Sequence, residues 1–575
     1  MLKLLARFAR PYGGQLLAVI ALQALTVGAI LFLPALNAKI IDDGVATGDT
    51  ATIWRLGGIM LAVALVQLAA SVSSVWFSAR VAMSIGRDLR AAIFRRVSGF
   101  STHQMSQFGP ATLITRATND VQQLQMVMLM AMSMLVLAPI MAVGGVVMAL
   151  REDAGLSWLV WVAVPIIVAI MVFAGLKMVP LFRQMQEAID DVNHILREQI
   201  TGMRVVRAFV REDYEAQRFT KANQHLTDLA IGVGKIFVVL FPVISLVLHG
   251  ATAAVLWFGG LRVADGLVEV GSLTAFMQYL LQILMAVMMA TMIFLMVPRA
   301  MVAAKRINEV LATEPELAEG SRDAANTQGY LEFRNVSFSY PGADEPVLTD
   351  ISFSAAPGQT IGIIGSTGSG KTTLLNLIPR LTDTSAGEVL IDGVPVHQYS
   401  REALSQIVSM VPQKAYLFSG TVASNLRFGA PEATDDAVWR ALETAQAKDF
   451  VAVRETAKGS GLASSIAQGG SDVSGGQRQR LAIARALTAG PSIYLFDDSF
   501  SALDATTDAA LRAALARHLL DATMLIVAQR VATIKDADHI LVLEHGRIVD
   551  AGTHDQLLAT SSVYQQIVQS QVGHG

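Results

Sequence analysis

The sequence predicts an N-terminal all-α domain of six membrane-spanning helices, followed by a C-terminal α/β domain of the P-loop NTPase type. Six apolar stretches before about residue 300 are each long enough for the roughly 20 residues that a spanning helix needs. A buried-strand pattern leads directly into a glycine-rich motif and then into a helix-like run. The chain of 575 residues is also too long for one hydrophobic core. We therefore predict a membrane domain at residues 1–311, a polar linker at 312–329 and an α/β domain at 330–575.

The predicted spans lie at residues 16–36, 56–77, 126–150, 156–178, 236–258 and 273–297. The first resembles a signal peptide, because Lys3, Arg7 and Arg10 precede it. Its apolar run is too long for that role, however, and five further spans follow. We expect a retained anchor.

Arginine distribution predicts the orientation of the spans. Arginines are concentrated between spans two and three and between spans four and five, whereas the only arginines in the opposite loops are Arg55, Arg151 and Arg262. Positive charge favours the cytoplasmic side. We therefore expect a multi-pass protein of a cell's inner (plasma) membrane, bacterial in origin, with both termini and the α/β domain in the cytoplasm.

The two inner connections are polar but helix-forming. Residues 183–219 contain few helix breakers besides Gly202, and apolar residues recur through them. The simplest geometry continues each spanning helix beyond the bilayer. About 20 extra residues would reach roughly 30 Å into the cytoplasm.

Composition excludes several classes of protein. Apolar residues make up 53% of the chain and charged residues 16%, which is unlike a typical soluble protein. The formal net charge of −3 argues against nucleic acid as a principal partner. Cysteine is absent, which excludes disulfides, thiol catalysis and cysteine metal sites. The sequence leaves open whether this absence is natural or engineered.

Two features of the spans have alternative interpretations. Methionines are abundant in the third and sixth spans, where they could form an adaptable wall for a greasy substrate or pack against lipid and other helices. His249, in the fifth span, is a functional candidate or a neutral imidazole bonded between helices. The methionines are Met126, Met128, Met130, Met132, Met134, Met141, Met277, Met285, Met288, Met289, Met292 and Met296.

The glycine-rich motif predicts a phosphate-binding loop. It consists of Gly365, Ser366, Thr367, Gly368, Ser369, Gly370, Lys371 and Thr372, and Thr373 follows it. Glycines let the backbone curl so that its N–H groups point at phosphate. We predict that Lys371 reaches the outer phosphates of ATP and that the Thr372 hydroxyl binds Mg²⁺.

Further segments follow in a recognisable order. They are Val411-Pro412-Gln413, Val473-Ser474-Gly475-Gly476-Gln477, the strand-like run 493–496 ending at Asp497 and Asp498, Ser501-Ala502-Leu503-Asp504, and Ile526-Val527-Ala528-Gln529-Arg530. Together with the P-loop and the six spans, they resemble the exporter-type ABC transporter family over essentially the whole chain. Residues 108–110 with Arg116 and residues 119–120, and residues 202–209 with Glu212, resemble that family's coupling regions.

The resemblance implies a fold and a set of roles. The α/β domain would be an ATP-binding cassette with a helical subdomain. Ser474, Gly475, Gly476 and Gln477 would form the signature that contacts ATP on a partner cassette. Asp497 would support Mg²⁺, and Gln413 would contact the metal and couple the γ-phosphate to the transmembrane helices. Tyr340 would stack on adenine; the alternative for Tyr340 is an aromatic of the strand core.

Two residues depart from the family pattern. Asp498 stands where glutamate is usual, and Gln529 where histidine is usual. The aspartate side chain is shorter by one C–C bond, about 1.5 Å, and a misplacement of about 1 Å can cost on the order of a hundredfold in rate. Glutamine cannot shuttle a proton. Gln468 also replaces a common glutamate, which puts coupling details in doubt. We predict a slowly hydrolysing site in the degenerate half of a heterodimeric exporter.

Alternatives remain open at this point. The chain could form a slow homodimer, an ATP-gated channel or regulator, or an importer of iron chelates or other solutes that uses the same fold. Soluble ATPase functions are excluded by the six spans. The expected partners are a second ABC half, membrane lipid and a small amphipathic or hydrophobic substrate such as a drug or lipid.

Overall fold

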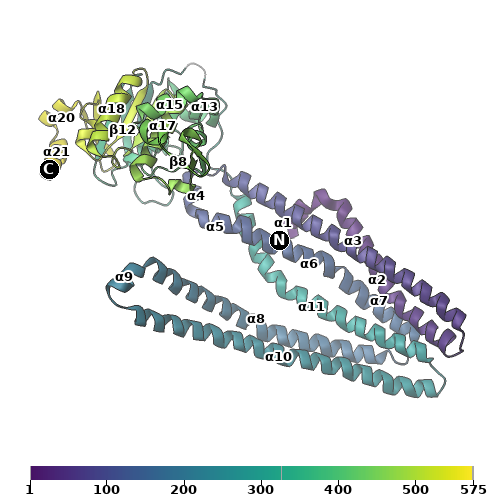
Figure 1. Ribbon diagram of the computed structural model, residues 1–575. Coiled ribbons are helices and arrows are strands. Elements are labelled where there is room, and N and C mark those ends of the chain that lie inside the picture. Colours follow the sequence, from purple (N-terminus) through teal and green to yellow (C-terminus); the bar gives the residue numbers. More distant parts are fainter. Residues whose placement is uncertain (1, 325–326, 573–575) are drawn as a thin grey trace. The chain divides into compact units, whose positions relative to one another are not determined.

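The computed structural model describes residues 2–324 and 327–572, and excludes the side chains at 2, 135, 291–299 and 572 (Figure 1). The chain forms two compact units. One comprises Met1–Ser98 and Pro110–Thr313, and the other comprises Gly99–Gly109 and Glu314–Gly575. We refer to them as the membrane unit and the cassette unit. The second unit includes a short stretch taken from within the predicted membrane domain.

The membrane unit is all-helical. Within the described residues, six helical runs are long and apolar enough to cross a bilayer: Lys3–Val45, Thr50–Val97, Pro110–Glu152, Trp158–Thr201, Glu212–Ala264 and Val270–Ala290. The prediction of six spans is therefore confirmed. The helices are α1 (Leu2–Ala9), α2 (Gly13–Lys39), α3 (Thr50–Val97), α5 (Pro110–Thr115), α6 (Val121–Met130), α7 (Leu137–Glu152), α8 (Trp158–Thr201), α9 (Met203–Ala208), α10 (Glu212–Ala264) and α11 (Val270–Ala312). Short helical turns connect several of them: η1 (Arg10–Tyr12), η2 (Ile40–Val45), η3 (Arg116–Asp120) and η4 (Ala131–Leu135).

Two helices continue far beyond the length of a span. α8 has 44 residues and α10 has 53, so at 1.5 Å per residue they extend roughly 65 and 80 Å. The hydrocarbon core of a bilayer is about 30 Å thick. α8 ends at its C-cap residue, Gly202. Helix α9 then connects α8 to α10, and α10 runs back along α8 (Figure 1). The predicted helical extensions are therefore present.

The side chains of the methionine-rich spans do not form one wall. Met128 and Met141 are buried, whereas Met126 and Met285 are exposed. The side chains of Met292 and Met296 lie outside the described residues. His249 is exposed on α10 in this chain. A polar contact does join other helices: Arg262 at the end of α10 donates to Asp153, in the turn after α7, through Nε and Nη2 at 2.7 and 3.1 Å.

The cassette unit contains two main sheets. The six-stranded sheet has the order β14-β13-β3-β12-β11-β6, in which only β14 is antiparallel to its neighbour, and the four-stranded antiparallel sheet has the order β2-β1-β4-β5. The strands are β1 (Leu331–Phe338), β2 (Leu348–Ala355), β3 (Thr360–Gly365), β4 (Ala386–Ile391), β5 (Val394–Pro395), β6 (Val408–Val411), β11 (Ile493–Asp497), β12 (Thr523–Val527), β13 (His539–Glu544) and β14 (Arg547–Gly552). Short pairs form between β7 (Gly420–Thr421) and β10 (Ser465–Ile466), and between β8 (Glu455–Thr456) and β9 (Gly459–Ser460).

Helices surround these sheets. They are α4 (Thr102–Phe108), α12 (Lys371–Leu377), α13 (Arg401–Ile407), α14 (Val422–Leu426), α15 (Asp435–Thr444), α16 (Lys448–Ala452), α17 (Gly475–Ala489), α18 (Ala505–His518), α19 (Val531–Ile534), α20 (His554–Thr560) and α21 (Ser562–Val572), with the shorter turns η5 (Val396–Gln398), η6 (Gly461–Ala463) and η7 (Gln468–Gly470). Every residue of β11 and β12 is buried, as expected for parallel strands that are covered on both faces. Helices α14 to α17 lie between β6 and β11 in the chain and form the predicted helical part of an α/β cassette.

Candidate nucleotide-binding site

Parallel strand register brings three loops together at one edge of the six-stranded sheet. Val527 on β12 pairs with Ile363 on β3 and with Asp497 on β11. Because parallel strands point the same way, the loops after β3, β11 and β12 leave the sheet side by side. These loops carry the P-loop, Asp498 and Gln529, which were predicted from three separate stretches of sequence. This is the carboxyl edge, where open α/β sheets bind ligands.

Glycines in the P-loop meet specific backbone requirements. Gly368 and Gly370 have φ values of 85° and 96°, in a region that residues with a Cβ rarely adopt. A Cβ on Gly365 would lie 2.1 Å from Leu543 O, so the loop can pass β13 only without a side chain there. The resulting curl can point successive N–H groups at phosphate.

Lys371 lies over this loop. Its Nζ donates hydrogen bonds to Gly365 O at 2.9 Å and Ser366 O at 2.7 Å. Burial lowers the pKa of the Lys371 ammonium, and the nearby carboxylates Asp497 and Asp498 oppose that shift. A partly desolvated cation in this position gains from an anionic ligand, because phosphate oxygens would replace the hydration it has lost.

Thr372 and Asp497 supply the oxygen atoms that Mg²⁺ prefers. Thr372 Oγ1 donates to Asp497 Oδ1 at 3.0 Å, so the two oxygens lie next to each other. Burial raises the pKa of Asp497, and the hydrogen bond from Thr372 acts against it. In the part of the chain that the structure describes, no cluster of three or more His, Cys, Asp or Glu residues could hold a metal. The residues present fit Mg²⁺, which is commonly held by one or two protein ligands together with substrate phosphates.

Asp498 is the centre of an amide–carboxylate cluster. Its Oδ2 accepts hydrogen bonds from Gln413 Nε2 at 3.2 Å and from Gln529 Nε2 at 2.8 Å. The side chain is 7% exposed, and the backbone is held at φ 47° with its N–H bonded to Val527 O. All three residues that were predicted to act in catalysis therefore meet at one carboxylate oxygen.

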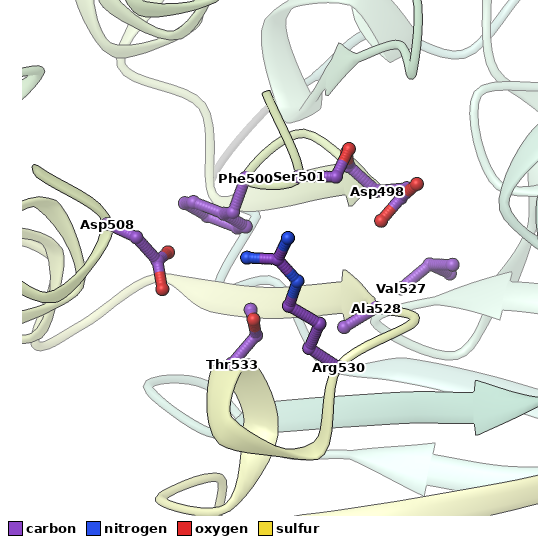
Figure 2. Close-up of a pocket in the computed structure, with 8 residues that line it drawn as sticks. All are labelled: Asp498, Phe500, Ser501, Asp508, Val527, Ala528, Arg530 and Thr533. Carbon is purple, nitrogen blue, oxygen red and sulfur yellow. The ribbon is translucent and has the colours of Figure 1, made fainter. Parts of the chain in front are cut away.

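A small pocket adjoins Asp498 beneath the loop after β12. Its volume is about 10 Å³, which is close to the minimum for one water molecule. Figure 2 shows the Arg530 side chain extending into it. Among the described residues, Asp508 Oδ1 is buried there without a hydrogen-bond partner, while Asp508 Oδ2 pairs with Arg512 at 3.2 Å. Sequence reasoning did not single out Arg530 or Asp508, because nothing in the local sequence indicates that Asp508 faces this loop.

Tyr340 lies beside the P-loop helix. Its hydroxyl and Thr373 Oγ1 are 3.1 Å apart, and its ring packs edge-on against Phe338. The side chain is 42% exposed. An exposed ring tied to the helix that follows the phosphate loop is suited to stack on a nucleotide base.

The signature residues form the start of α17. Ser474 accepts a hydrogen bond from Gln477 N, and Gln477 Oε1 accepts one from Ser474 N, which makes a reciprocal capping box. Gly476 passes close to the loop after β11: a Cβ there would lie 3.4 Å from Ala502 O. Ser474 and Gly475 are exposed. In the described residues their hydrogen bonds are local, so the structure does not join the signature to the P-loop of the same chain. Gln468, in η7, likewise has no described bond to the P-loop.

Comparison with known proteins agrees with this geometry. Residues 16–287 match the family described as "ABC transporter transmembrane region", and residues 348–501 match "ABC transporter". An uncharacterized ABC transporter ATP-binding protein of Mycobacterium tuberculosis is 46% identical, covering 99% of this chain and 98% of that protein. The ATP-dependent lipid A-core flippase of Thiobacillus denitrificans is 31% identical, covering 94% and 93%.

A solved structure has the same fold. The structure of a bacterial Atm1-family ABC exporter with ATP bound superimposes with a TM-score of 0.78 at 24% identity, covering 98% of this chain and 99% of that one. The fold is thus that of a P-loop cassette joined to a six-helix membrane region. The chain belongs to the ABC transporter family. It is an exporter-type half, a multi-pass membrane protein with an ATPase cassette in the same polypeptide.

Proposed function

We propose that this chain is the degenerate subunit of an ATP-driven exporter that moves an amphipathic or hydrophobic solute. Its P-loop would bind ATP with Mg²⁺ and hydrolyse it slowly. Its signature residues would complete a faster site on a partner half-transporter. Both termini and the cassette would lie in the cytoplasm, because the inner connections carry most of the membrane domain's arginine.

The observation that carries the slow-site proposal is the arrangement around Asp498. A general base must hold an attacking water and accept its proton. Here two amide donors already occupy Asp498 Oδ2, at 3.2 and 2.8 Å. Both amides donate to the short aspartate side chain, and neither amide can take up a proton. The cluster is therefore suited to hold nucleotide rather than to turn it over.

The signature supports the second half of the proposal. Ser474, Gly475, Gly476 and Gln477 follow the regular family pattern, and their capping box is intact. The exposed start of a 15-residue helix offers the N–H groups of its first turn and a partial positive charge to phosphate. A site of this form can act on ATP held by another cassette.

The substrate class is proposed from the membrane region and from relatives. The spans are strongly apolar, and several relatives at 31–35% identity are named ATP-dependent lipid A-core flippases. Lipids are amphipathic, so a lipid or a lipid-like drug fits the proposal. A fluorescent phospholipid, followed across the bilayer of proteoliposomes with and without ATP, is a direct probe of this class.

Restoring the usual residues tests the slow-site proposal. We expect the double variant Asp498→Glu with Gln529→His to raise hydrolysis at this site by about tenfold to a hundredfold, because the carboxylate advances by one C–C bond and a proton acceptor is added. Single-turnover hydrolysis of radiolabelled ATP measures the rate, in a complex whose partner has its own P-loop lysine replaced.

The control is a second aspartate-to-glutamate substitution, which adds one methylene group at a site away from the nucleotide. Asp521→Glu changes an exposed residue of the cassette and should leave the rate unchanged. An unchanged rate in the double variant, with ATP binding intact, would show that these two residues do not limit hydrolysis.

A further inference from the structure

Helix α21 reaches the loop that joins β12 to α19, which is the loop that carries Gln529. We propose that Gln571, near the end of α21, is a positioning residue of the nucleotide site: it clamps this loop and so fixes the Gln529 amide at Asp498. The proposal rests on the nucleotide site proposed above. It does not depend on the identity of the transported solute or of the partner chain.

The amide group of Gln571 bonds to the loop backbone on both sides of Arg530. Its Nε2 donates to Gln529 O at 2.8 Å, and its Oε1 accepts from Val531 N at 2.8 Å. An amide that uses its donor and its acceptor together fixes the orientation of the loop as well as its position. Gln571 is itself exposed, so these two bonds, rather than burial, are what its side chain contributes.

The start of α19 lacks a cap from its own neighbouring residue. The helix has only four residues, and its N-cap residue, Arg530, makes no side-chain bond to the first turn. The first N–H groups of a helix have no partner within the helix, and Val531 N is one of them. Gln571 therefore supplies, from a separate helix, a bond of the kind that a local cap usually supplies.

Spacing along α21 explains why Gln571 reaches the loop. Tyr564, Ile567 and Gln571 are separated by three and four residues, so they lie on one face of the helix. Tyr564 is fully buried, and Ile567 packs against the buried cluster that includes Ile534 of α19. The helix is thus seated on the cassette core before it reaches Gln571, which keeps the amide aligned with the loop.

The clamped loop lies on the side of the site where the outermost phosphate would be held. Gln529 Nε2 donates to Asp498 Oδ2 at 2.8 Å, and Asp498 directly follows Asp497, whose Oδ1 accepts from Thr372 Oγ1. A metal at such a pair bridges the second and third phosphates of ATP. A shift of the loop would move the Gln529 amide away from the third phosphate and leave the P-loop contacts to the inner phosphates in place. Binding of ATP should therefore depend on the clamp more than binding of ADP.

Hydrogen–deuterium exchange of the full-length complex in lipid nanodiscs tests the clamp directly. Gln571→Met keeps an unbranched side chain of similar length and removes both polar atoms. We expect exchange at residues 529–534 to become faster by about fivefold, which is the size of effect that a lost hydrogen bond commonly has, while residues 562–570 keep their protection. Faster exchange at 562–570 as well would mean that Gln571 only holds α21 in place, and would overturn the proposal.

Nucleotide affinity tests the positioning role, in a complex whose partner has its own P-loop lysine replaced. We expect Gln571→Met to weaken binding of a non-hydrolysable ATP analogue with Mg²⁺ by about fivefold to tenfold, and binding of ADP by less than about twofold. Equal losses for the two nucleotides would indicate a general loss of structure and would contradict the proposal.

The matched control is Gln569→Met, which changes an exposed glutamine on the same helix and should behave like the unmodified protein. Gln571→Glu is the conservative variant. Its carboxylate can still accept from Val531 N but cannot donate to Gln529 O, so its exchange at 529–534 should lie between that of the unmodified protein and that of Gln571→Met. A response of Gln571→Met equal to that of Gln569→Met would overturn the proposal.

Gln529→Ala separates this proposal from the function on which it rests. It removes the amide and leaves the backbone bonds to Gln571, so we expect the loss of affinity for the ATP analogue without faster exchange at 529–534. If Gln529→Ala loses this affinity and Gln571→Met does not, the clamp is refuted and the role of Gln529 in the site stands. If Gln529→Ala binds the analogue normally, the role of Gln529 falls, and the positioning role of Gln571 falls with it.

Discussion

At the scale of single residues, the nucleotide site contains ionisable side chains whose charged forms are disfavoured by burial. Asp497 and Lys371 lie in the same partly dry edge of the sheet, and the pKa of each is shifted toward its neutral form by burial. Burying such groups lowers the stability of the folded protein, and groups of this kind are concentrated at ligand-binding and catalytic sites. Nucleotide with Mg²⁺ is the ligand that would satisfy both.

Replacing Asp497 tests whether its buried carboxylate destabilises the protein in the absence of nucleotide. The folded pKa of Asp497 lies above its unfolded value, so the carboxyl group lowers stability as the pH rises through the interval between the two, and the penalty persists above it. We expect Asp497→Asn to raise the apparent unfolding temperature of the nucleotide-free protein at about pH 7, with the gain shrinking as the pH falls below the interval. Thermal unfolding followed across pH measures this.

Asp521→Asn, at an exposed site, is the control and should show no such gain. A lower unfolding temperature for Asp497→Asn at about pH 7 would mean that the bond with Thr372 outweighs burial. Stabilisation by Mg²⁺ and ATP should be lost in the same variant, because its carboxylate is gone.

Tyr340 allows a test of base stacking against a purely structural role. We expect Tyr340→Ala to weaken ATP binding by about 5- to 150-fold, as stacking on an aromatic ring contributes about 1–3 kcal/mol per base. Binding of inorganic triphosphate, which has no base, should change little. Tyr340→Phe keeps the ring and loses the bond to Thr373, so its affinity for ATP should lie between that of the unmodified protein and that of Tyr340→Ala. Equal losses for ATP and triphosphate would identify Tyr340 as a strand-core aromatic instead.

The residues of the site differ in how far the sequence could predict them. The P-loop was predictable because its chemistry depends on a local strand, loop and helix. The hydrogen bonds from Gln413 and Gln529 to one oxygen of Asp498 were not, because Gln413 and Gln529 lie 85 and 31 residues away in the chain. Nor was the left-handed backbone of Asp498, since that depends on how β11 meets its neighbours.

At the scale of elements, the linker is an ordered strap on the cassette along 314–323. Gly320 is its tightest point, because a Cβ there would lie 2.3 Å from Tyr399 O and 2.5 Å from Gln398 O. These are backbone atoms, which cannot move aside cheaply. We expect Gly320→Ala to destabilise the protein by about 1–3 kcal/mol, measured as a lower apparent unfolding temperature.

Ser321→Ala is the neighbouring control: it keeps the backbone bond to Gln398 O and should have little effect. A Gly320→Ala protein as stable as the parent would mean that this part of the strap shifts freely.

The elements also show what periodicity and hydropathy can and cannot predict. Six spans followed from apolar length alone, and the long extensions of α8 and α10 followed from the scarcity of helix breakers. The wide turns of η3 and η4 in the third span did not, because they depend on packing against α11. The place of α4 in the cassette was hidden for the same reason: its partners lie 210 and 215 residues further along the chain.

At the scale of the whole molecule, the decisive property is subunit composition. The proposed action of the signature on another cassette requires a second chain, and the proposed slow site makes sense only if that chain has a faster one. We expect native mass spectrometry of the tagged protein, gently extracted from its host membrane, to give a one-to-one complex with a second ABC half. That partner should carry glutamate and histidine at the positions of Asp498 and Gln529.

A complex of two identical chains would give a different result. Asp498 and Gln529 would then have to support the turnover of the whole transporter, and the division of labour proposed above would fall. ATP binding and family membership would be unaffected.

The cassette unit is built from two separate segments of the chain, and this affects how genes of this family can recombine. A cut after residue 313 would separate the cassette from Gly99–Gly109, a part of its own structure that is encoded more than 200 residues upstream. A cassette grafted from a relative would meet a foreign α4 at the carbonyl of Glu314. Exchange between family members should therefore succeed when α4 and the linker travel together. The heritable module is a discontinuous pair of segments rather than the C-terminal half of the gene.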